Sequence, residues 1–378
     1  MLFLDSEGNK EEKNRVLKLR HHLNDHSDVQ RQEFHDMAQL VLLLLSRYEP
    51  ATNQLIRDFY ELQNDLETEI LQLFGRVNCN AFSIANDLTN KTVGIGLYPD
   101  SALFNHDCEP NCAVSFKGRE MLIHAIKDVN VGQELTVSYI ELLQSTTRRQ
   151  KELRESYFFD CECTRCKGGA NEMFAEDWYL DGLRCAANKD TTCCEGVVVV
   201  EGGDDCFEIA RCKMCGASRD SKEIHRQEKR LKDVEERKES NEHDKWEQYQ
   251  HKWEIMTSRL CLHPRNTRVA ELAREIGNFL SEASNLDLRR LARPFFQMEL
   301  RAVEWLLPTM KLPSRGLLHF QLGKLFFEQA TTLSRRNRAE PMECAAKHLE
   351  QALVVYVCSS LEMVCNFNSD VDGHVLVG

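Results

Sequence analysis

The sequence has few of the features that would set it apart from ordinary globular proteins. Only 8 of its 378 residues are proline and 18 are glycine, and 42% are hydrophobic, which excludes collagen-like, low-complexity and wholly disordered chains. The longest apolar run, residues 40–45, is too short to span a membrane. The first residues have no basic segment followed by an apolar core, so we expect no signal peptide and an intracellular protein.

Basic residues are scarce relative to acidic ones. The 48 Lys and Arg against 60 Asp and Glu give a net charge of −12. Such a surface repels nucleic acid, and no basic patch stands out, so we expect no direct nucleic-acid readout. An acidic surface suits basic, lysine-containing peptides. Without a strong basic import cluster, both nucleus and cytoplasm are compatible locations.

Length and periodicity predict several segments in sequence. Apolar residues recur at helical spacing through the first 75 residues, first at Phe34, Met37, Leu40, Val41, Leu44 and Leu45, then at Leu55, Phe59, Leu62, Leu66, Ile70 and Leu73. From residue 78 the period shortens towards two, and short strands are expected at 93–97, 121–126 and 135–140. A short charged helix is expected over 144–158, and a solvated charged helix or helical linker over 219–253.

The last third is expected to be helical, with one repeat-like stretch. Leu322-Gly323, Phe326 and then Ala345, Leu349 and Ala352 follow the spacing of a tetratricopeptide unit. Gly323 and Ala345 are about ten residues too far apart for a standard repeat, so such a unit would carry an inserted loop. An ordinary antiparallel helix pair is the alternative, and either one packs or binds peptide.

The cysteines are the informative part of the composition. There are 16, more than half of them between 160 and 216, in a compartment that keeps thiols reduced. Cys161, Cys163 and Cys166 can converge on one ion, since zinc prefers tetrahedral thiolate sites. Three thiols leave one ligand to come from elsewhere.

A second cysteine set resembles a zinc ribbon in its spacing. Its knuckle is Cys212 and Cys215, and strands at 197–200 and 207–210 supply a hairpin. The facing thiols are Cys185 and one of the pair Cys193-Cys194; we select Cys194 for the site, and Cys206 is a competitor. A redox pair is the alternative, but no thioredoxin pattern surrounds it. The scattered cysteines are expected to be small buried hydrophobes: Cys79, Cys112, Cys261, Cys344, Cys358 and Cys365.

Three short pieces carry the chemistry. They are 105–108 (Asn-His-Asp-Cys), 134–139 ending in a tyrosine, and the aromatic run 157–159. Singly, each has a plain interpretation: a loop cap, a half-buried strand residue and core packing. Their order and spacing together are specific, and Cys108 supplies the thiol that the 161–166 cluster lacks.

From about residue 78 to 166 the chain resembles the C-terminal half of a SET domain, in detail that of the SET and MYND (SMYD) family of protein lysine methyltransferases. The matching stretches are NCNAFSI, VGIGLYPDSALFNHDCEPNC, GQELTVSYIELL and ESYFFDCECTRC. The resemblance implies an α+β fold: a β-rich SET part with a zinc-bound post-SET segment, plus an all-α tetratricopeptide-like domain. The segments implied are 1–75 (helical insert), 76–143 (SET core), 144–218 (post-SET and zinc knuckle), 219–255 (linker) and 256–378 (helical domain).

The same resemblance assigns roles to residues. S-adenosylmethionine would be bound by Asn105 and His106 within a knot-like threading of two strands, with Asn80 as a further contact and Phe159 over the adenine. Tyr139 would be catalytic and also touch the cofactor. The substrate lysine channel would be lined by Phe82, Tyr139 and Tyr157. The zinc of the post-SET segment would be held by Cys108, Cys161, Cys163 and Cys166.

Several family features are not found in the sequence. No Gly-x-Gly strand turn precedes residue 80, and the first cysteine is Cys79, so a MYND zinc finger is not encoded. We therefore expect half of a split catalytic domain, a truncated form whose last twenty residues do not look like a family ending. Two functions follow. One is a lysine methyltransferase acting on histone or cytosolic proteins; the other is a catalytically silent, zinc-stabilised module whose helical domain binds a partner or chaperone tail.

Overall fold

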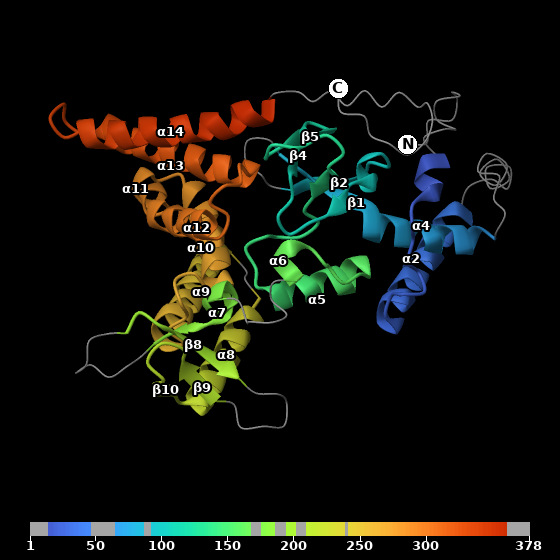
Figure 1. Ribbon diagram of the computed structural model, residues 1–378, viewed down its shortest axis with the longest axis horizontal. Helices are drawn as coiled ribbons and strands as arrows, with labels where there is room; N and C mark the ends of the chain where they lie inside the picture. Colours follow the sequence, from blue (N-terminus) through green and yellow to red (C-terminus); the bar gives the residue numbers. More distant parts are fainter. Residues whose placement is uncertain are drawn as a thin grey trace. The chain divides into compact units, whose positions relative to one another are not determined.

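The structure is a computed structural model, and it contains both helices and strands, as the α+β prediction requires (Figure 1). The residues it describes are 14–46, 65–86, 92–167, 175–185, 194–201, 209–238 and 241–360. They fall into two compact units. The first comprises Met1–Ile123, Gly132–Ile140 and Gln150–Glu162, and the second His124–Val131, Glu141–Arg149 and Cys163–Gly378. None of the helices in the described ranges has the length and apolar character needed to cross a membrane.

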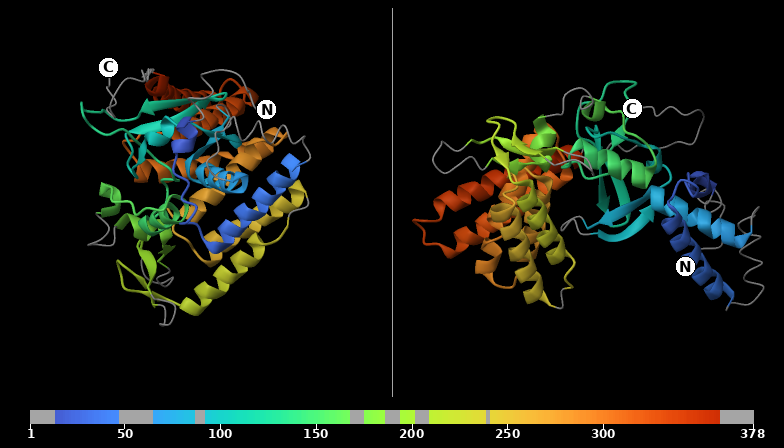
Figure 2. Two further views of the ribbon diagram at one scale, coloured as in Figure 1. Left: turned by 90° about the vertical axis from the view of Figure 1, so that its right-hand side faces the viewer. Right: turned by 90° about the horizontal axis from the view of Figure 1, so that it is seen from below.

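Two helices, α2 (Asp28–Ser46) and α4 (Leu66–Asn80), pack together in the first unit (Figure 2). The Phe34 ring of α2 lies 6.1 Å from that of Phe74, so part of the predicted apolar stripe is buried. The prediction that the whole apolar stripe is buried is wrong further along the helix, because Leu40 and Leu44 of α2 are exposed. The predicted positions at 55, 59 and 62 lie outside the described residues.

The helix α4 is longer than the sequence predicts. It continues through Asn80, whereas the sequence predicts a change to strand periodicity from residue 78. The side chain of Asn80 donates from Nδ2 to the carbonyl of Arg76 at 2.9 Å, one turn back along the same helix. At the other end, the Asp65 carboxylate accepts from the Thr68 amide as an N-cap.

Strands of the first unit form small pairs rather than one large sheet. The strand β1 (Ala81–Ala85) pairs antiparallel with β2 (Thr92–Leu97), which agrees with the predicted strand at 93–97. Next along the chain, β4 (Cys112–Lys117) pairs with β5 (Glu120–Ala125) around the left-handed Gly118 (φ 63°). Between β2 and β4 the chain forms the short helix η1 (Ser101–Leu103).

The most unusual pair is β3 (Asn105–His106) with β6 (Thr136–Val137), which run parallel. The predicted strand 135–140 is therefore too long: only two residues pair. The chain turns immediately afterwards because the Ser138 hydroxyl donates to the Ile140 carbonyl at 2.7 Å. A parallel pair this short cannot be recognised from periodicity, which needs at least four residues.

The second unit contains a four-stranded antiparallel sheet in the order β10-β9-β8-β7. Its strands are β7 (Leu183–Arg184), β8 (Val197–Glu201), β9 (Ile209–Cys212) and β10 (Ser218–Arg219). The predicted strand 197–200 is confirmed. Of the predicted strand 207–210, residues 209 and 210 belong to β9, and residues 207 and 208 lie outside the described residues. The helix predicted over 144–158 is α5 (Thr146–Tyr157), and α6 (Thr164–Lys167) and α7 (Ala175–Asp181) follow.

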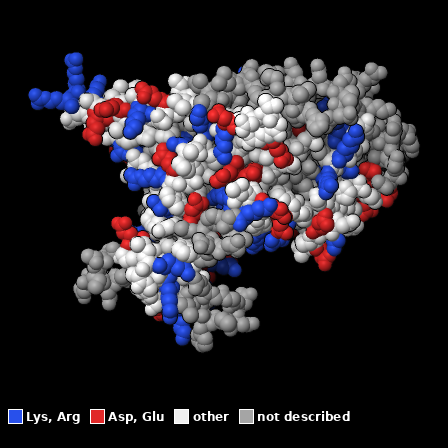
Figure 3. Space-filling model, in the orientation of Figure 1, with Lys and Arg blue, Asp and Glu red and all other residues white. Residues whose placement is uncertain are grey.

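The charged stretch forms two helices, α8 (Ser221–Glu235) and α9 (Glu242–Glu254), so its helical character is confirmed. It is not merely a solvated linker, because Ile224, Leu231 and Val234 of α8 are buried. The charges occupy the remaining faces. Acidic and basic side chains are interspersed on the described part of the face seen in Figure 3, so on that face the net charge of −12 does not gather into one patch.

The rest of the second unit is helical, as predicted, and its core is apolar. Its elements are η3 (Ile255–Arg259), α10 (Thr267–Ser281), α11 (Leu286–Arg290), α12 (Arg293–Leu306), α13 (Pro313–Thr332) and α14 (Ala339–Ser360). An ion pair joins the half-buried Arg274 of α10 to the buried Glu299 of α12, and Arg274 also contacts Glu141 at 3.0 Å. The guanidinium therefore fixes the segment that follows Tyr139 to this helical core.

The repeat-like stretch is the hairpin of α13 and α14. A Cβ on Gly323 would lie 2.7 Å from Cγ of Leu349, so glycine is needed where the two helices cross. The predicted inserted loop is wrong, since only residues 333–338 connect the helices and the extra length is helical. The tetratricopeptide-like nature of the pair stays a prediction.

Candidate active site

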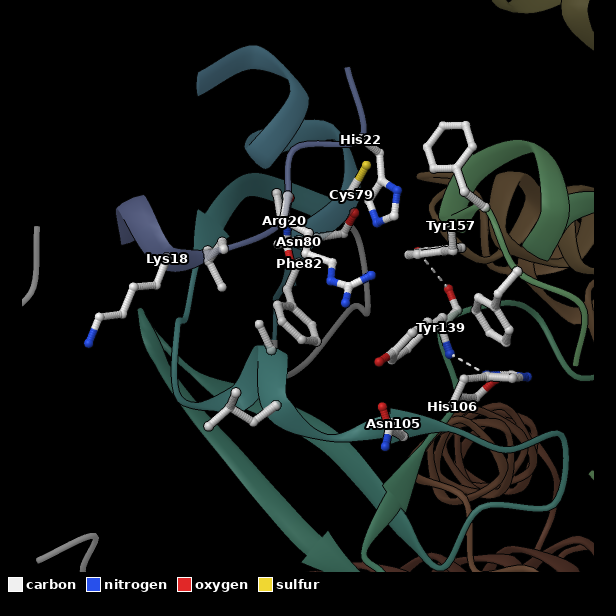
Figure 4. Close-up of a pocket in the computed structure, with 18 residues that line it drawn as sticks. Lys18, Arg20, His22, Cys79, Asn80, Phe82, Asn105, His106, Tyr139 and Tyr157 are labelled. Atoms are coloured by element: carbon white, nitrogen blue, oxygen red, sulfur yellow. Dashed lines mark hydrogen bonds between the residues drawn. The ribbon is translucent and has the colours of Figure 1, made fainter. Parts of the chain in front are cut away.

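The residues predicted for cofactor and substrate line one cavity of about 890 Å³ within the first unit (Figure 4). They come from four separate stretches of chain: Asn80, Phe82, Asn105, His106, Tyr139, Tyr157 and Phe159. The volume lies in the usual range for small-molecule sites. The structure thus brings together residues up to 79 positions apart, from Asn80 to Phe159, while their individual roles remain predictions.

Asn105 and His106 are placed by the parallel pair of β3 and β6. The Asn105 amide donates to Oε1 of Glu134 at 2.6 Å. The neighbouring Asn111 bonds the same turn twice, donating to the Glu134 carbonyl and accepting from the Thr136 amide, each at 2.8 Å. These bonds occupy backbone groups that a two-residue ladder leaves unpaired, which is how so short a pair is stabilised.

Tyr139 is held at three polar groups. Its amide donates to Nδ1 of His106 at 3.0 Å, its hydroxyl donates to the Phe104 carbonyl at 2.6 Å, and its carbonyl accepts from the Tyr157 hydroxyl at 3.1 Å. Burial, with smaller contributions from Tyr157 and Glu134, raises the pKa of Tyr139 to about 12. The phenol is therefore neutral throughout the physiological range.

Aromatic rings form one wall of the cavity. The Tyr139 ring lies 4.9 Å from that of Tyr157 and 6.4 Å from that of Phe159. The pKa of Tyr157 is also raised by burial. Between these residues Phe158 has a left-handed backbone (φ 61°), which is strained for a residue with a Cβ. This turn at the end of α5 sends Phe158 towards His22 and His26 and leaves Phe159 beside His106.

Several cavity residues were missed by the sequence reasoning. Lys18, Arg20 and His22 precede α2, and Cys79 and Phe158 flank predicted positions. The stretch from Lys18 to His22 is connected to α4 because the side-chain amide of Asn80 donates to the Arg20 carbonyl at 2.9 Å. A Cβ on Gly75 would lie 2.2 Å from the His21 carbonyl oxygen. A glycine inside α4 was the one available signal of this close approach.

The first cysteine cluster consists of Cys108, Cys161, Cys163 and Cys166, whose sulfurs all lie within 4.8 Å of one another. Three are buried and Cys163 is half-buried. The loop is held at Cys161, whose amide donates to Gln150 Oε1 and whose carbonyl accepts from Gln150 Nε2. Four converging thiols match a structural zinc site.

The second cysteine cluster consists of Cys185, Cys194, Cys212 and Cys215, also within 4.8 Å of one another. The sulfurs of Cys194 and Cys212 are 3.8 Å apart. Burial raises the pKa of Cys212, but the Cys215 and Met214 amides outweigh it and lower the pKa to about 7. That favours the thiolate that zinc requires. Cys193 and Cys206 lie outside the described residues.

The scattered cysteines agree only in part with the expectation of burial. Cys112 is buried, whereas Cys79, Cys261 and Cys344 are half-buried. The side chain of Cys358 and the whole of Cys365 lie outside the described residues. Burial raises the pKa of Cys79 to about 11, so its thiol stays protonated beside the cavity.

Residues 8–140 match the model of the SET domain, so the chain contains this domain. Over 99 residues it is 42% identical to the histone-lysine N-methyltransferase SMYD3 of Homo sapiens, covering 26% of this chain and 23% of that protein. It is 39% identical over 114 residues to the N-lysine methyltransferase SMYD2-B of Danio rerio, covering 29% of this chain and 26% of that protein. It is 34% identical over 157 residues to the histone-lysine N-methyltransferase ASHR1 of Arabidopsis thaliana, covering 41% of this chain and 32% of that protein.

The SET-domain match and the SMYD-named relatives agree with the resemblance to the SMYD family that the motifs predict. The matched stretches cover less than a third of the relatives' own lengths: 23%, 26% and 32%.

Proposed function

We propose that the protein is an S-adenosylmethionine-dependent protein-lysine N-methyltransferase acting on histone or other lysines. The observation that carries the proposal is the single cavity that gathers the Asn-His pair, Tyr139 and the aromatic residues from four stretches of the chain. The alternative interpretations of each motif as a cap or core residue do not require such convergence.

The cavity residues fit the cofactor chemically. Asn80 and Asn105 offer amide groups for polar recognition, and Phe159 offers an aromatic face for a purine. Arg20 points its guanidinium into the cavity (Figure 4), where it would pair with the carboxylate of an amino-acid moiety. When bound, S-adenosylmethionine supplies a methyl group on a cationic sulfonium.

The protein's own groups would prepare the lysine. Methyl transfer is a direct displacement with no covalent enzyme intermediate, so alignment of the reacting atoms is the main contribution. Phe82, Tyr139 and Tyr157 would enclose the lysine stem and exclude water, and desolvation lowers the pKa of the amine towards its neutral form. The neutral Tyr139 hydroxyl, which already donates to the Phe104 carbonyl, presents its oxygen as an acceptor for the amine.

Labelled S-adenosylmethionine, offered with histones and with cytosolic extract, tests this function directly. We expect incorporation into protein, together with cofactor binding measurable by calorimetry. The proposal fails if neither incorporation nor binding is seen. Metal analysis is a separate check, since both cysteine clusters together should give about two zinc equivalents. We propose the nucleus and the cytoplasm as locations, because the sequence shows no strong basic import cluster that would favour the nucleus alone.

A second function is supported by the exposed apolar residues of the helical hairpin. Phe320 and Phe327 of α13 and Leu353 of α14 are 41%, 47% and 62% exposed. This surface suits a tetratricopeptide-like role in which the hairpin binds a partner peptide, including a chaperone tail. If the chain binds such a peptide but no cofactor, it is a zinc-stabilised interaction module instead of an enzyme.

A further inference from the structure

The imidazole of His106 contacts both the first cysteine cluster and the proposed catalytic tyrosine. Its Nδ1 is 3.0 Å from the Tyr139 amide (Figure 4). Its Nε2 is 3.2 Å from the sulfur of Cys108. Both nitrogens of one ring are therefore engaged, on opposite sides. The ring also lies 5.4 Å from the Tyr139 ring and 6.1 Å from that of Phe159.

These two contacts determine the tautomer. A backbone N–H can only donate, so Nδ1 must accept and cannot carry the proton of a neutral imidazole. The proton is then on Nε2 and points at Cys108, whose sulfur must accept it. A metal-bound thiolate is a much better acceptor than a thiol, which carries a proton of its own. Zinc at the first cluster and the observed orientation of His106 thus favour each other.

The same orientation is what holds Tyr139. If the imidazole turned or changed tautomer, the Tyr139 amide would lose its acceptor, although the Phe104 and Tyr157 bonds would remain. The backbone of Tyr139 is then fixed on one side only. A small displacement of the phenol matters in methyl transfer, where alignment supplies most of the rate.

We propose that His106 is a positioning residue that couples zinc at the first cluster to the placement of Tyr139. The proposal rests on the proposed function for its consequence, loss of transfer, but its structural part is independent of it. Cys108 is both a ligand of the cluster and the acceptor for Nε2–H, and Tyr139 receives the orientation through Nδ1. The cofactor contact assigned to His106 by family resemblance needs neither bond.

Two substitutions separate the two bonds. His106→Asn keeps an oxygen near the Nδ1 position that can accept from the Tyr139 amide, but removes the donor to Cys108. His106→Gln keeps an amide donor near the Nε2 position and removes the acceptor. The second cluster, in the same molecule, is the internal control for metal handling.

The readouts are zinc affinity by chelator competition, the Tyr139 amide signal by nuclear magnetic resonance, and methyl transfer. For His106→Asn we expect one zinc equivalent to be held about 10- to 100-fold more weakly, with the other unchanged and the Tyr139 amide still hydrogen-bonded when zinc is saturating. For His106→Gln we expect both equivalents at wild-type affinity, a shifted Tyr139 amide and reduced transfer. If the two variants bind zinc with equal affinity, or lose zinc affinity and the Tyr139 amide hydrogen bond to the same extent, the coupling is wrong.

A measurement on the unmodified protein keeps the test independent of folding in the variants. The ¹⁵N shifts of the His106 ring are expected to show the Nε2–H tautomer with zinc bound, and the Tyr139 amide is expected to shift when zinc is removed. An Nδ1–H tautomer of His106 contradicts the proposal, and so does a Tyr139 amide signal that does not shift when zinc is removed. If these hold but no methyl transfer is found under any condition, the coupling stands and the proposed function fails.

Discussion

The two cysteine clusters use the same four-thiol donor set for different purposes. The first joins Cys108 to a loop more than fifty residues later, and three of its four thiols are buried, with Cys108 beside His106 of the cavity. The second closes a sheet whose strands are two to five residues long, and one of its thiols, Cys215, is exposed. Identical ligands therefore say little about function. What surrounds them decides it: the first cluster is expected to support a binding site, the second only its own sheet.

The largest expected effect breaks the first cluster. Cys161→Ser should remove one zinc equivalent and weaken cofactor binding at least about tenfold, because the loop that carries Phe159 loses its metal anchor. Cys212→Ser is the matched variant and should remove the other equivalent while cofactor binding is retained. Metal analysis and calorimetry measure both. If the two variants affect cofactor binding equally, the distinction between the clusters is wrong.

A smaller effect separates chemistry from metal binding. Tyr139→Phe should lower methyl transfer by about 10²-fold, since it removes a polar group placed for the reacting amine, while both zinc equivalents and cofactor affinity are kept. Transfer kinetics with labelled cofactor, set beside calorimetry, show this split. Unchanged transfer would mean that Tyr139 does not have the proposed role.

The second cluster can be disturbed without touching a ligand. A Cβ on Gly196 would lie 2.7 Å from the Cys212 sulfur and 2.9 Å from that of Cys194, so Gly196→Ala should weaken its zinc about tenfold. Gly94→Ala is the control, because a Cβ there meets nothing within 4 Å. Chelator competition should show one weakened equivalent for the first variant and none for the control. Weakening of the other equivalent would contradict the assignment.

The smallest effect concerns a region that neither cluster stabilises. His319 of α13 and His348 of α14 bond through their Nδ1 atoms at 2.9 Å. Burial, with His348 and Arg315 nearby, lowers the pKa of His319 to about 4, and burial also lowers that of His348. A lowered pKa means that the unfolded chain binds protons first, so this stability is present above about pH 6.5 and is lost as the pH falls towards 4.

The measurement is thermal unfolding of zinc-free protein between pH 7 and 4, with circular dichroism as the readout. The midpoint should fall by a few degrees more in the wild type than in His319→Gln, which removes one of the two titrating groups. Using zinc-free protein removes the competing effect of acid on both clusters. An identical pH dependence in the two proteins would show that the histidine pair does not contribute.

Much of the site could be predicted from local sequence because its motifs are short and contiguous. The Asn-His pair, the 161–166 cysteines and the Tyr157 to Phe159 run are each readable in a few residues, and the helices follow from periodicity. The boundaries were less accurate: the strand at 135–140 shrinks to Thr136–Val137, and α4 runs on to Asn80. In both places a side-chain hydrogen bond, from Ser138 or Asn80, overrides the periodic pattern.

The sequence alone indicated the resemblance to SMYD proteins, the α+β class and which residue types the site contains, because these depend on local order and spacing. Only the tertiary structure decided that Lys18, Arg20 and His22 join the cavity. It also decided the tautomer of His106, since that depends on a tyrosine amide 33 residues away. Long-range contacts of this kind leave no periodic trace in a single sequence, because nothing in the local chain records what will pack against it.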